Sequence, residues 1–268
     1  MSGAPRDRRK SFDGAVDFYE EIRPRYPAAL FTDLFNNLPT DPSILEVGPG
    51  TGQATCDLLL RGARVHAVEL GAAMADKLRE VVRSERLTVT VGDFESVEIP
   101  AHSTDAVFSA TAYHWISPRT QLDRPAHILK SGGLLAIVDL NQVTSADDEG
   151  FFAAAQPIYE RYGEPHTGPP APERNAVIPA IRAPLDGDQR FTHVGTRCYD
   201  WNQTYTADEY RKLMFSYSGT QMMTPENRRG LLDDIEAFII ANFSGSVTRP
   251  IVVTLTTAVY DGEVYSFR

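Results

Sequence analysis

The sequence predicts an α/β fold around a doubly wound, mostly parallel β-sheet, and three observations support this. Short apolar runs alternate with helical patterns through the first half of the chain. The runs are rich in Val, Ile, Leu and Ala and are bounded by Gly, Asp or Pro, which is typical of buried strands in a parallel sheet. A glycine-rich turn joins the first run to a helical segment. Strand, helix and strand in succession imply right-handed crossovers.

The elements of the first half follow in chain order. An amphipathic helix is predicted over 27–38. Strands are predicted over 43–47, 64–69, 87–91, 105–110 and 133–139. Helices over 53–61, 72–82 and 118–130 connect them. For the last helix, Ser117 is the expected N-cap, Pro118 the first helical residue, and Gly132 a residue beyond its end.

In the second half of the chain, short apolar runs no longer alternate regularly with helical patterns. After a helix over 151–162, the proline-rich segment 163–188 is predicted to be irregular and on the surface. A strand over 191–204 leads to two helices, the first opened by a capping box of Thr206 and Glu209, the second by Thr224 and Pro225. A last strand covers 251–260. If the two late strands pair, they form an antiparallel edge on a seven-stranded sheet, with the helices inserted as a lid.

Composition excludes several classes of protein. Hydrophobic residues make up 42% of the chain and charged residues 23%, as in ordinary globular proteins. The formal net charge of −10 repels phosphate backbones and anionic lipids, so we expect neither nucleic acid nor membrane as a partner. Two cysteines, no apolar leader and no long apolar stretch favour a cytoplasmic location. No metal-ligand spacing appears, and no metal is expected.

The sharpest local signal is a glycine-rich segment. Residues 44–55 read Ile-Leu-Glu-Val-Gly-Pro-Gly-Thr-Gly-Gln-Ala-Thr. Glycines let the backbone turn tightly and let a ligand approach it closely. Gln53 stands where the dinucleotide fingerprint needs its third glycine, and no Gly-Lys-Ser or Gly-Lys-Thr follows. A cofactor without bridging phosphates therefore fits best.

Two acidic residues extend this signal. Glu69 closes the second strand at the spacing expected of a carboxylate that binds two ribose hydroxyls. Asp93 follows the third strand and precedes Phe94, so it is placed to accept from an adenine amino group while the ring packs nearby. Singly, each feature is also explained as a tight turn or a helix cap. Their order along the chain favours a nucleoside cofactor.

In this order the motifs resemble class I S-adenosylmethionine-dependent methyltransferases with the type 11 domain, in which Glu-Val-Gly-Pro-Gly-Thr-Gly is a common first motif. The resemblance covers about residues 40–140. It implies a Rossmann-like fold, an enzyme that uses S-adenosylmethionine, and S-adenosylhomocysteine as product. Segments 19–27, 112–115 and 210–218 resemble a bacterial and fungal branch that includes enzymes similar to trans-aconitate methyltransferases.

The resemblance, with the place of the loop after the fourth strand, also implies site residues. The expected cofactor-binding residues are Tyr19, Arg23, Glu46, Gly48, Gly50, Gly52, Gln53, Glu69, Leu70, Asp93, Phe94 and Thr111. The expected substrate-binding residues are Tyr113, His114, Trp115 and Tyr217. We expect one domain, in which 1–40 form an N-terminal cap, 41–141 the cofactor-binding core and 142–268 substrate-facing additions.

Methyl transfer from a sulfonium is an in-line displacement, so the protein mainly positions the acceptor and excludes water. The loop 111–116 is expected beside the methyl group. His114 is the candidate catalytic base for a hydroxyl, amine or acidic carbon, because its ordinary pKa lies near neutral pH. A carboxylate acceptor needs no base. The alternative for His114 is a structural residue that spaces the loop.

The predicted function is methylation of a small molecule, at an oxygen of a carboxylic acid or of a natural-product-like acceptor. Methylation at nitrogen, sulfur or carbon is an alternative, as is a non-catalytic cofactor-binding module. A nicotinamide-dependent oxidoreductase is disfavoured by Gln53 and the glycine spacing. An RNA or protein methyltransferase is disfavoured by the acidic charge. The sequence carries no signal for an oligomeric state.

Overall fold

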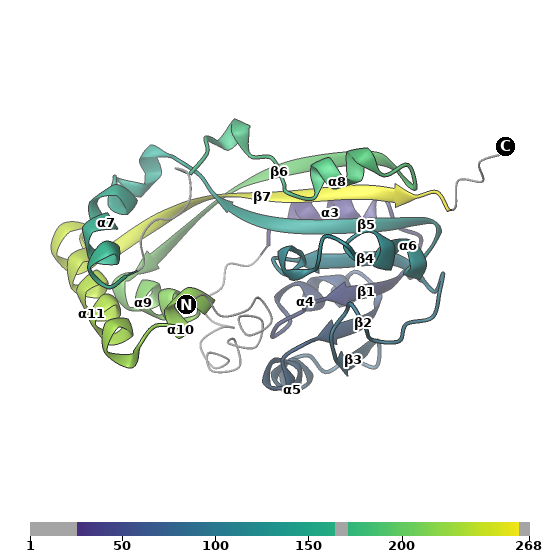
Figure 1. Cartoon of the computed structure of the whole chain (residues 1–268), viewed down its shortest axis with the longest axis horizontal. Coiled ribbons are helices and arrows are strands. Elements are labelled where there is room, and N and C mark those ends of the chain that lie inside the picture. Colours follow the sequence, from purple (N-terminus) through teal and green to yellow (C-terminus); the bar gives the residue numbers. More distant parts are fainter. Residues whose placement is uncertain (1–25, 164–170, 263–268) are drawn as a thin grey trace. The chain divides into compact units, whose positions relative to one another are not determined.

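The computed structural model describes residues 26–163 and 171–262 (Figure 1). The chain divides into two compact units, which we describe separately. Among the described residues, the sheet unit consists of 26–140, 178–199 and 253–262, and the helical unit of 141–163, 171–177 and 200–252. The predicted block of substrate-facing additions, 142–268, therefore contributes to both units. That the whole chain is one domain stays a prediction.

The seven strands form one sheet in the order β3-β2-β1-β4-β5-β7-β6. Their bounds are Ser43–Val47 (β1), Arg64–Glu69 (β2), Leu87–Val91 (β3), Thr104–Ala110 (β4), Leu129–Gln142 (β5), Phe191–Thr206 (β6) and Ser246–Tyr260 (β7). The first five pair in parallel, and the edge beyond them is antiparallel. The predicted α/β fold with a mostly parallel sheet and an antiparallel edge is confirmed.

The strand order places a topological switch point between β1 and β4. These strands are parallel neighbours, with Glu46 opposite Phe108. Their carboxyl ends therefore lie at the same edge of the sheet, and the segments that follow them leave the sheet side by side. In open α/β sheets, ligands bind at such a point.

Five α-helices belong to the sheet unit within the described residues. They are Ala28–Phe35 (α3), Gln53–Leu60 (α4), Ala72–Val81 (α5), Asp123–Ile128 (α6) and Arg182–Gly187 (α8). In α3, Leu30, Phe31 and Leu34 fall on one face of the helix and are fully buried. The Phe31 ring lies 6.4 Å from that of Phe108 on β4. Each such side chain stabilises the fold by about 1.5–3 kcal/mol, which fixes α3 against the sheet.

The helix predicted over 118–130 is wrong in length and in its start. Only α6, Asp123–Ile128, is helical, and Ser117 is not its N-cap. The carboxylate of Glu95 accepts from the backbone N–H of Ser117 at 3.1 Å and from the hydroxyl of Thr120 at 3.1 Å. This tether from a distant part of the chain holds 117–121 in turns, so the helix begins later.

Two further predictions need correction. The strand predicted from 133 begins at Leu129, and its register with β4 shifts between Thr104 and Ala106, so that Gly132 lies within an irregular stretch of strand. The segment 163–188 is not wholly irregular, because it contains α8. Ile181 and Leu185, one helical turn apart, are both buried, which stabilises that short helix despite the neighbouring prolines.

The helical unit has a core of its own. It contains Phe151–Arg161 (α7), Ala207–Phe215 (α9), Ser218–Gln221 (α10) and Pro225–Asn242 (α11), and Figure 1 shows α7, α9 and α11 packed together. The predicted capping box of Thr206 and Glu209 and the N-cap Thr224 are confirmed. Buried residues of these helices form one apolar cluster around Phe151, which contacts the Tyr210 ring edge to face at 5.2 Å.

Candidate functional site

The glycine turn after β1 touches the loop after β4 directly. Gly48 has φ +66° and Gly52 φ +107°, a backbone conformation that side chains disfavour. A Cβ on Gly48 would lie 2.5 Å from the Cβ of Ala112, and one on Gly52 would lie 2.8 Å from Leu78. Glycine is therefore required at both positions by backbone conformation and by space. Gly48 of the glycine turn and Ala112 of the loop after β4 are therefore in close contact next to the switch point.

Glu69 joins the glycine turn to the start of α5. One carboxylate oxygen accepts from the backbone N–H of Gly50 at 3.0 Å, and the other accepts from Gly71 at 2.9 Å. Each carboxylate oxygen can accept more than one hydrogen bond. Half-buried at the end of β2, this carboxylate is held rigidly at the edge of the turn, as a group that binds ribose hydroxyls should be.

Glu46 is a buried carboxyl group behind the same turn. It is 1% exposed, and the hydroxyl of Thr55 donates to it at 2.7 Å. Burial raises the pKa of Glu46 to about 7, against the lowering effect of the Thr55 hydrogen bond, and the charge of Glu69 raises it further. The group therefore titrates near neutral pH. A cation bound nearby would favour its charged form.

A second unusual polar group lies within the turn. The hydroxyl of Thr51 is buried and has no hydrogen-bond partner in the part of the chain that the structure describes. An unsatisfied buried hydroxyl costs about 1–3 kcal/mol. Such a cost is expected where a ligand completes the hydrogen bonding.

Asp93 and Phe94 follow β3, but their surroundings differ. One carboxylate oxygen of Asp93 accepts from the backbone N–H of Glu95 at 3.0 Å, which fixes a turn. The ring of Phe94 is 3% exposed and packs in the core, with the guanidinium carbon of Arg124 5.7 Å from its centroid. The half-exposed Asp93 is thus better placed to meet a ligand than Phe94. Contact of either residue with a cofactor stays a prediction.

The loop after β4 has a constrained backbone. Thr111 has φ +57°, which is uncommon for a residue with a branched side chain. Its N–H donates to the carbonyl of Val138 at 2.8 Å, and its hydroxyl lies 3.2 Å from that of Tyr26. Strain of this kind collects at functional sites.

A short 3₁₀ helix, Tyr113–Trp115 (η2), carries the three aromatic residues of this loop. Tyr113 is buried and donates to the carbonyl of Gln121, and burial raises its pKa well above its ordinary value. The side chain of His114 is exposed, 4.9 Å from the Trp115 ring, although protein around the imidazole lowers its pKa. Of the three, His114 is the residue most accessible to a substrate.

Asp139 is a candidate that the sequence analysis missed. It directly follows Val138, which pairs with Ala110 at the end of β4, so it adjoins the strained Thr111. It is half-buried, and burial raises its pKa. An acidic residue at the end of the fifth predicted strand was the available signal, as it was for Glu69 and β2.

The remaining predicted residues fall into three groups. Gln53 begins α4, and Leu70 follows β2. In the helical unit, the hydroxyl of Tyr217 accepts from Nη1 of Arg249 at 2.6 Å. Tyr19 and Arg23 lie outside the described residues. The sheet unit thus brings together most of the predicted cofactor-binding residues at one edge of the sheet.

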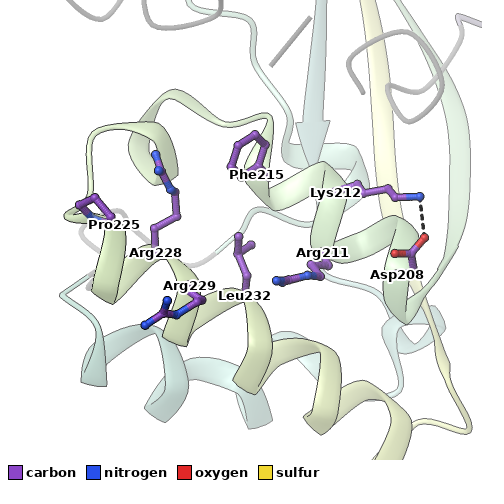
Figure 2. A pocket seen from close by; sticks show the side chains of 8 residues that line it. All are labelled: Asp208, Arg211, Lys212, Phe215, Pro225, Arg228, Arg229 and Leu232. Atoms are coloured by element: carbon purple, nitrogen blue, oxygen red, sulfur yellow. Dashed lines mark ion pairs between the residues drawn. The ribbon is translucent and has the colours of Figure 1, made fainter. Parts of the chain in front are cut away.

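A pocket of about 370 Å³ lies between α9 and α11 in the helical unit (Figure 2). Four cationic side chains line it, together with residues that include Phe215 and Leu232. Two of the cations are already neutralised, because Lys212 pairs with Asp208 at 2.7 Å, and Arg211 with Asp233 at 2.7 Å. None of the predicted site residues lines this pocket, so we do not assign it to the predicted reaction.

Two kinds of feature are absent from the described residues. No cluster of three or more His, Cys, Asp or Glu side chains in these residues is arranged to hold a metal ion. Over the same residues, no helix is both long enough and apolar enough to cross a membrane.

Part of the sheet unit is similar to a known protein family. Residues 45–137, which include the glycine turn, Glu69, Asp93 and the loop after β4, match the family model of a methyltransferase domain. The chain therefore contains a methyltransferase domain over these residues. The predicted family is thereby confirmed, whereas the branch similar to trans-aconitate methyltransferases stays a prediction.

Relatives of this methyltransferase domain share only part of their length with the chain. An uncharacterised methyltransferase of Mycobacterium tuberculosis is 35% identical over 139 residues, which cover 52% of this chain and 55% of the relative. One of Geobacillus is 27% identical over 156 residues, or 56% of this chain and 71% of the relative. The chain spans about half the length of the mycobacterial relatives that it matches.

Solved structures show the same fold. A protein of Anaeromyxobacter dehalogenans is 24% identical with a TM-score of 0.58, covering 88% of this chain and 96% of its own. Phosphoethanolamine N-methyltransferase 2 of Haemonchus contortus, solved with phosphomonomethylethanolamine and S-adenosylhomocysteine, is 18% identical with a TM-score of 0.56, covering 96% of this chain and 60% of its own.

Proposed function

We propose that the protein transfers a methyl group from S-adenosylmethionine to a small molecule. The observation that carries this proposal is the glycine turn, which packs against the loop after β4 and is joined to the start of α5 by the Glu69 carboxylate. This arrangement lies at the switch point of a methyltransferase domain. The Haemonchus enzyme of the same fold binds S-adenosylhomocysteine.

The residues of the turn fit this cofactor chemically. S-adenosylmethionine, when bound, supplies an electrophilic methyl group on a sulfonium. Glu69 would bind the ribose hydroxyls and Asp93 the adenine amino group, while Leu70 flanks the adenosine. The unsatisfied hydroxyl of Thr51 and the buried Glu46 offer an acceptor and a negative charge for the cationic methionine part. Gly48, Gly50, Gly52 and Gln53 would surround that part.

The acceptor that we favour is an oxygen of a small carboxylic acid. Thr111, Tyr113, His114 and Trp115 would form the wall on which it rests, because they follow β4 beside the glycine turn. A carboxylate is already nucleophilic at neutral pH, so its methylation requires position rather than a base. Methylation of nitrogen, sulfur or carbon is the second candidate, and the exposed His114 and half-buried Asp139 favour it as available bases.

The test is calorimetric titration of the full chain with S-adenosylmethionine and, separately, with NADH. We expect S-adenosylmethionine to bind and NADH not to bind. Glu69→Ala should weaken S-adenosylmethionine binding by about 5- to 150-fold, because an unpaired buried polar group costs about 1–3 kcal/mol. Glu85→Ala, which removes an exposed carboxylate of the same unit, should leave the affinity unchanged.

Two outcomes would sink the assignment. One is S-adenosylmethionine binding that Glu69→Ala leaves untouched, since the cofactor would then lie elsewhere. The other is preferential binding of NADH, which would return the glycine turn to the dinucleotide class. Binding of S-adenosylmethionine without methyl transfer to any acceptor would leave a non-catalytic module.

A second prediction concerns His114. If the acceptor is a carboxylate, His114→Gln should lower kcat by less than about tenfold, because no proton has to be removed. The measurement is methyl transfer to the best acceptor from a panel of small acids, amines and phenols, with Trp115→Phe as the control for loop packing. A loss of about 10²- to 10⁴-fold would instead identify base catalysis and thus a protonated acceptor.

A further inference from the structure

Arg249 is a cation enclosed in the helical unit. It lies on β7, where its Nη1 donates to the Tyr217 hydroxyl at 2.6 Å and its Nη2 donates to Oε1 of Gln142 at 3.0 Å. The guanidinium carbon is 5.9 Å from the centroid of the Tyr217 ring. The residue keeps part of its surface exposed, but its Nε is buried and donates to no group among the described residues.

Among the described residues, no carboxylate neutralises this charge. Within 26–163 and 171–262, Arg249 forms no ion pair, and its two hydrogen-bond partners are a neutral hydroxyl and a neutral amide. Three other arginines of the unit are paired with acidic residues. They are Arg161 with Asp234, Arg174 with Asp147 and Asp200, and Arg211 with Asp233 and Glu236. A buried charge is costly unless it is paired, so Arg249 stands apart from these surface pairs.

Several tyrosines lie near the guanidinium. Tyr159, Tyr205 and Tyr210, as well as Tyr217, lie close enough to interact with it electrostatically. The hydroxyls of Tyr159 and Tyr210 are 3.2 Å apart, and the rings of Tyr205 and Tyr210 meet edge to face at 6.2 Å. Burial raises the pKa of Tyr210 well above its ordinary value, so this hydroxyl stays neutral. The group thus offers hydrogen bonds but no compensating negative charge.

We propose that Arg249, Tyr217 and Gln142 form a site in the helical unit that binds the carboxylate of a small molecule. Guanidinium has five N–H donors, of which Tyr217 and Gln142 use two. The Nε–H and a neighbouring N–H form the fork that a carboxylate accepts side-on. This inference does not rest on methyl transfer, because the charge requires a partner whatever reaction the protein performs.

Charge balance selects a carboxylate over a phosphate. The site has one half-buried positive charge, which a single carboxylate neutralises. A phosphate monoester carries about −1.5 to −2 at neutral pH, so its binding would leave a buried excess of negative charge. A sulfonium or ammonium ligand would repel Arg249. The ligand class is therefore a small organic acid.

The test measures thermal unfolding with added ligands at constant ionic strength. Succinate should raise the melting temperature of the wild type by about 3–5 °C at ten times its dissociation constant. Succinamide, its neutral diamide, should have no effect, and inorganic phosphate a smaller one than succinate. Arg249→Met should lose the response to succinate while its own melting temperature is equal to or above that of the wild type, because an unpaired charge has been removed.

Two more variants keep the test decisive. Arg249→Lys retains the charge but not the fork, so it should bind succinate about tenfold more weakly, and it serves if Arg249→Met does not fold. Arg229→Met removes an exposed arginine that lines the pocket between α9 and α11 and should respond like the wild type. The proposal is overturned if succinate stabilises wild type and Arg249→Met equally. It is also overturned if Arg249→Lys binds succinate as tightly as the wild type.

Discussion

Gly48→Ala is expected to lower the free energy of unfolding by about 2–5 kcal/mol and to abolish binding of S-adenosylmethionine. Two costs add. A residue with a side chain at φ +66° lowers the free energy of unfolding by about 1–2 kcal/mol. In addition, a Cβ that lies 2.5 Å from the Cβ of Ala112 forces the backbone to shift, which typically costs about 1–3 kcal/mol. The shift must occur in the glycine turn or in the loop after β4. Urea unfolding gives the first quantity and calorimetry the second.

Gly132→Ala is the matched control for this prediction. Gly132 also has a positive φ, +76°, but a Cβ placed on it would meet nothing within 4 Å. This variant should therefore lose only the backbone cost, about 1–2 kcal/mol, and bind S-adenosylmethionine normally. Equal losses of stability in both variants would show that the contact with Ala112 is unimportant. Normal binding of S-adenosylmethionine by Gly48→Ala would show that the contact between the glycine turn and the loop after β4 does not form part of the cofactor site.

Local sequence determined the parts of the fold that were predicted correctly. The strands β1 to β4 and the helices α4 and α5 have apolar runs and boundaries that need no distant partner. The glycine turn was recognisable because Gly48 and Gly52 have a positive φ, a local backbone conformation that favours glycine. The same reasoning failed for 118–130, where the Glu95 carboxylate, more than twenty positions earlier, holds Ser117 and Thr120 in turns.

In the candidate site, too, some residues could be predicted from local sequence and others only from the structure. Glu69 was found because an acidic residue at the end of a strand has an expected spacing. Asp139 has the same kind of position on β5 but no such spacing rule, and only the pairing of Val138 with Ala110 places it beside the loop after β4. Arg249 carries no local signal at all, since its importance lies in the absence of an acidic partner among the described residues. The sequence does not show which side chains surround Arg249, so this could be found only from the structure.

Glu46 is expected to make both stability and cofactor binding depend on pH. Burial raises its pKa from 4.5 to about 7 in the folded protein. Between these values the folded state holds a proton that the unfolded state has lost, so stability falls as pH rises through this window and is constant above it. The full shift corresponds to about 3 kcal/mol. Glu46→Gln has no such proton, so its stability relative to the wild type should increase from pH 5 to pH 8.

Urea unfolding at pH 5 and pH 8 measures this difference. Glu98→Gln is the control, because Glu98 is exposed and lies in the same unit. The amide oxygen that Glu46→Gln introduces can still accept from the Thr55 hydroxyl, so the comparison isolates the charge. A difference between wild type and Glu46→Gln that does not change with pH would mean that Glu46 titrates near its ordinary pKa.

Binding of S-adenosylmethionine should lower the pKa of Glu46, which burial raises. The methionine part of S-adenosylmethionine is cationic, and a cation near Glu46 favours its charged form, so binding should release a proton below pH 7. The affinity at pH 6 should therefore be about tenfold weaker than at pH 8. Calorimetry in two buffers of different ionisation enthalpy counts the released protons directly. Glu46→Gln should release none and bind equally at both pH values, whereas proton release that persists in this variant would assign the linkage to another group.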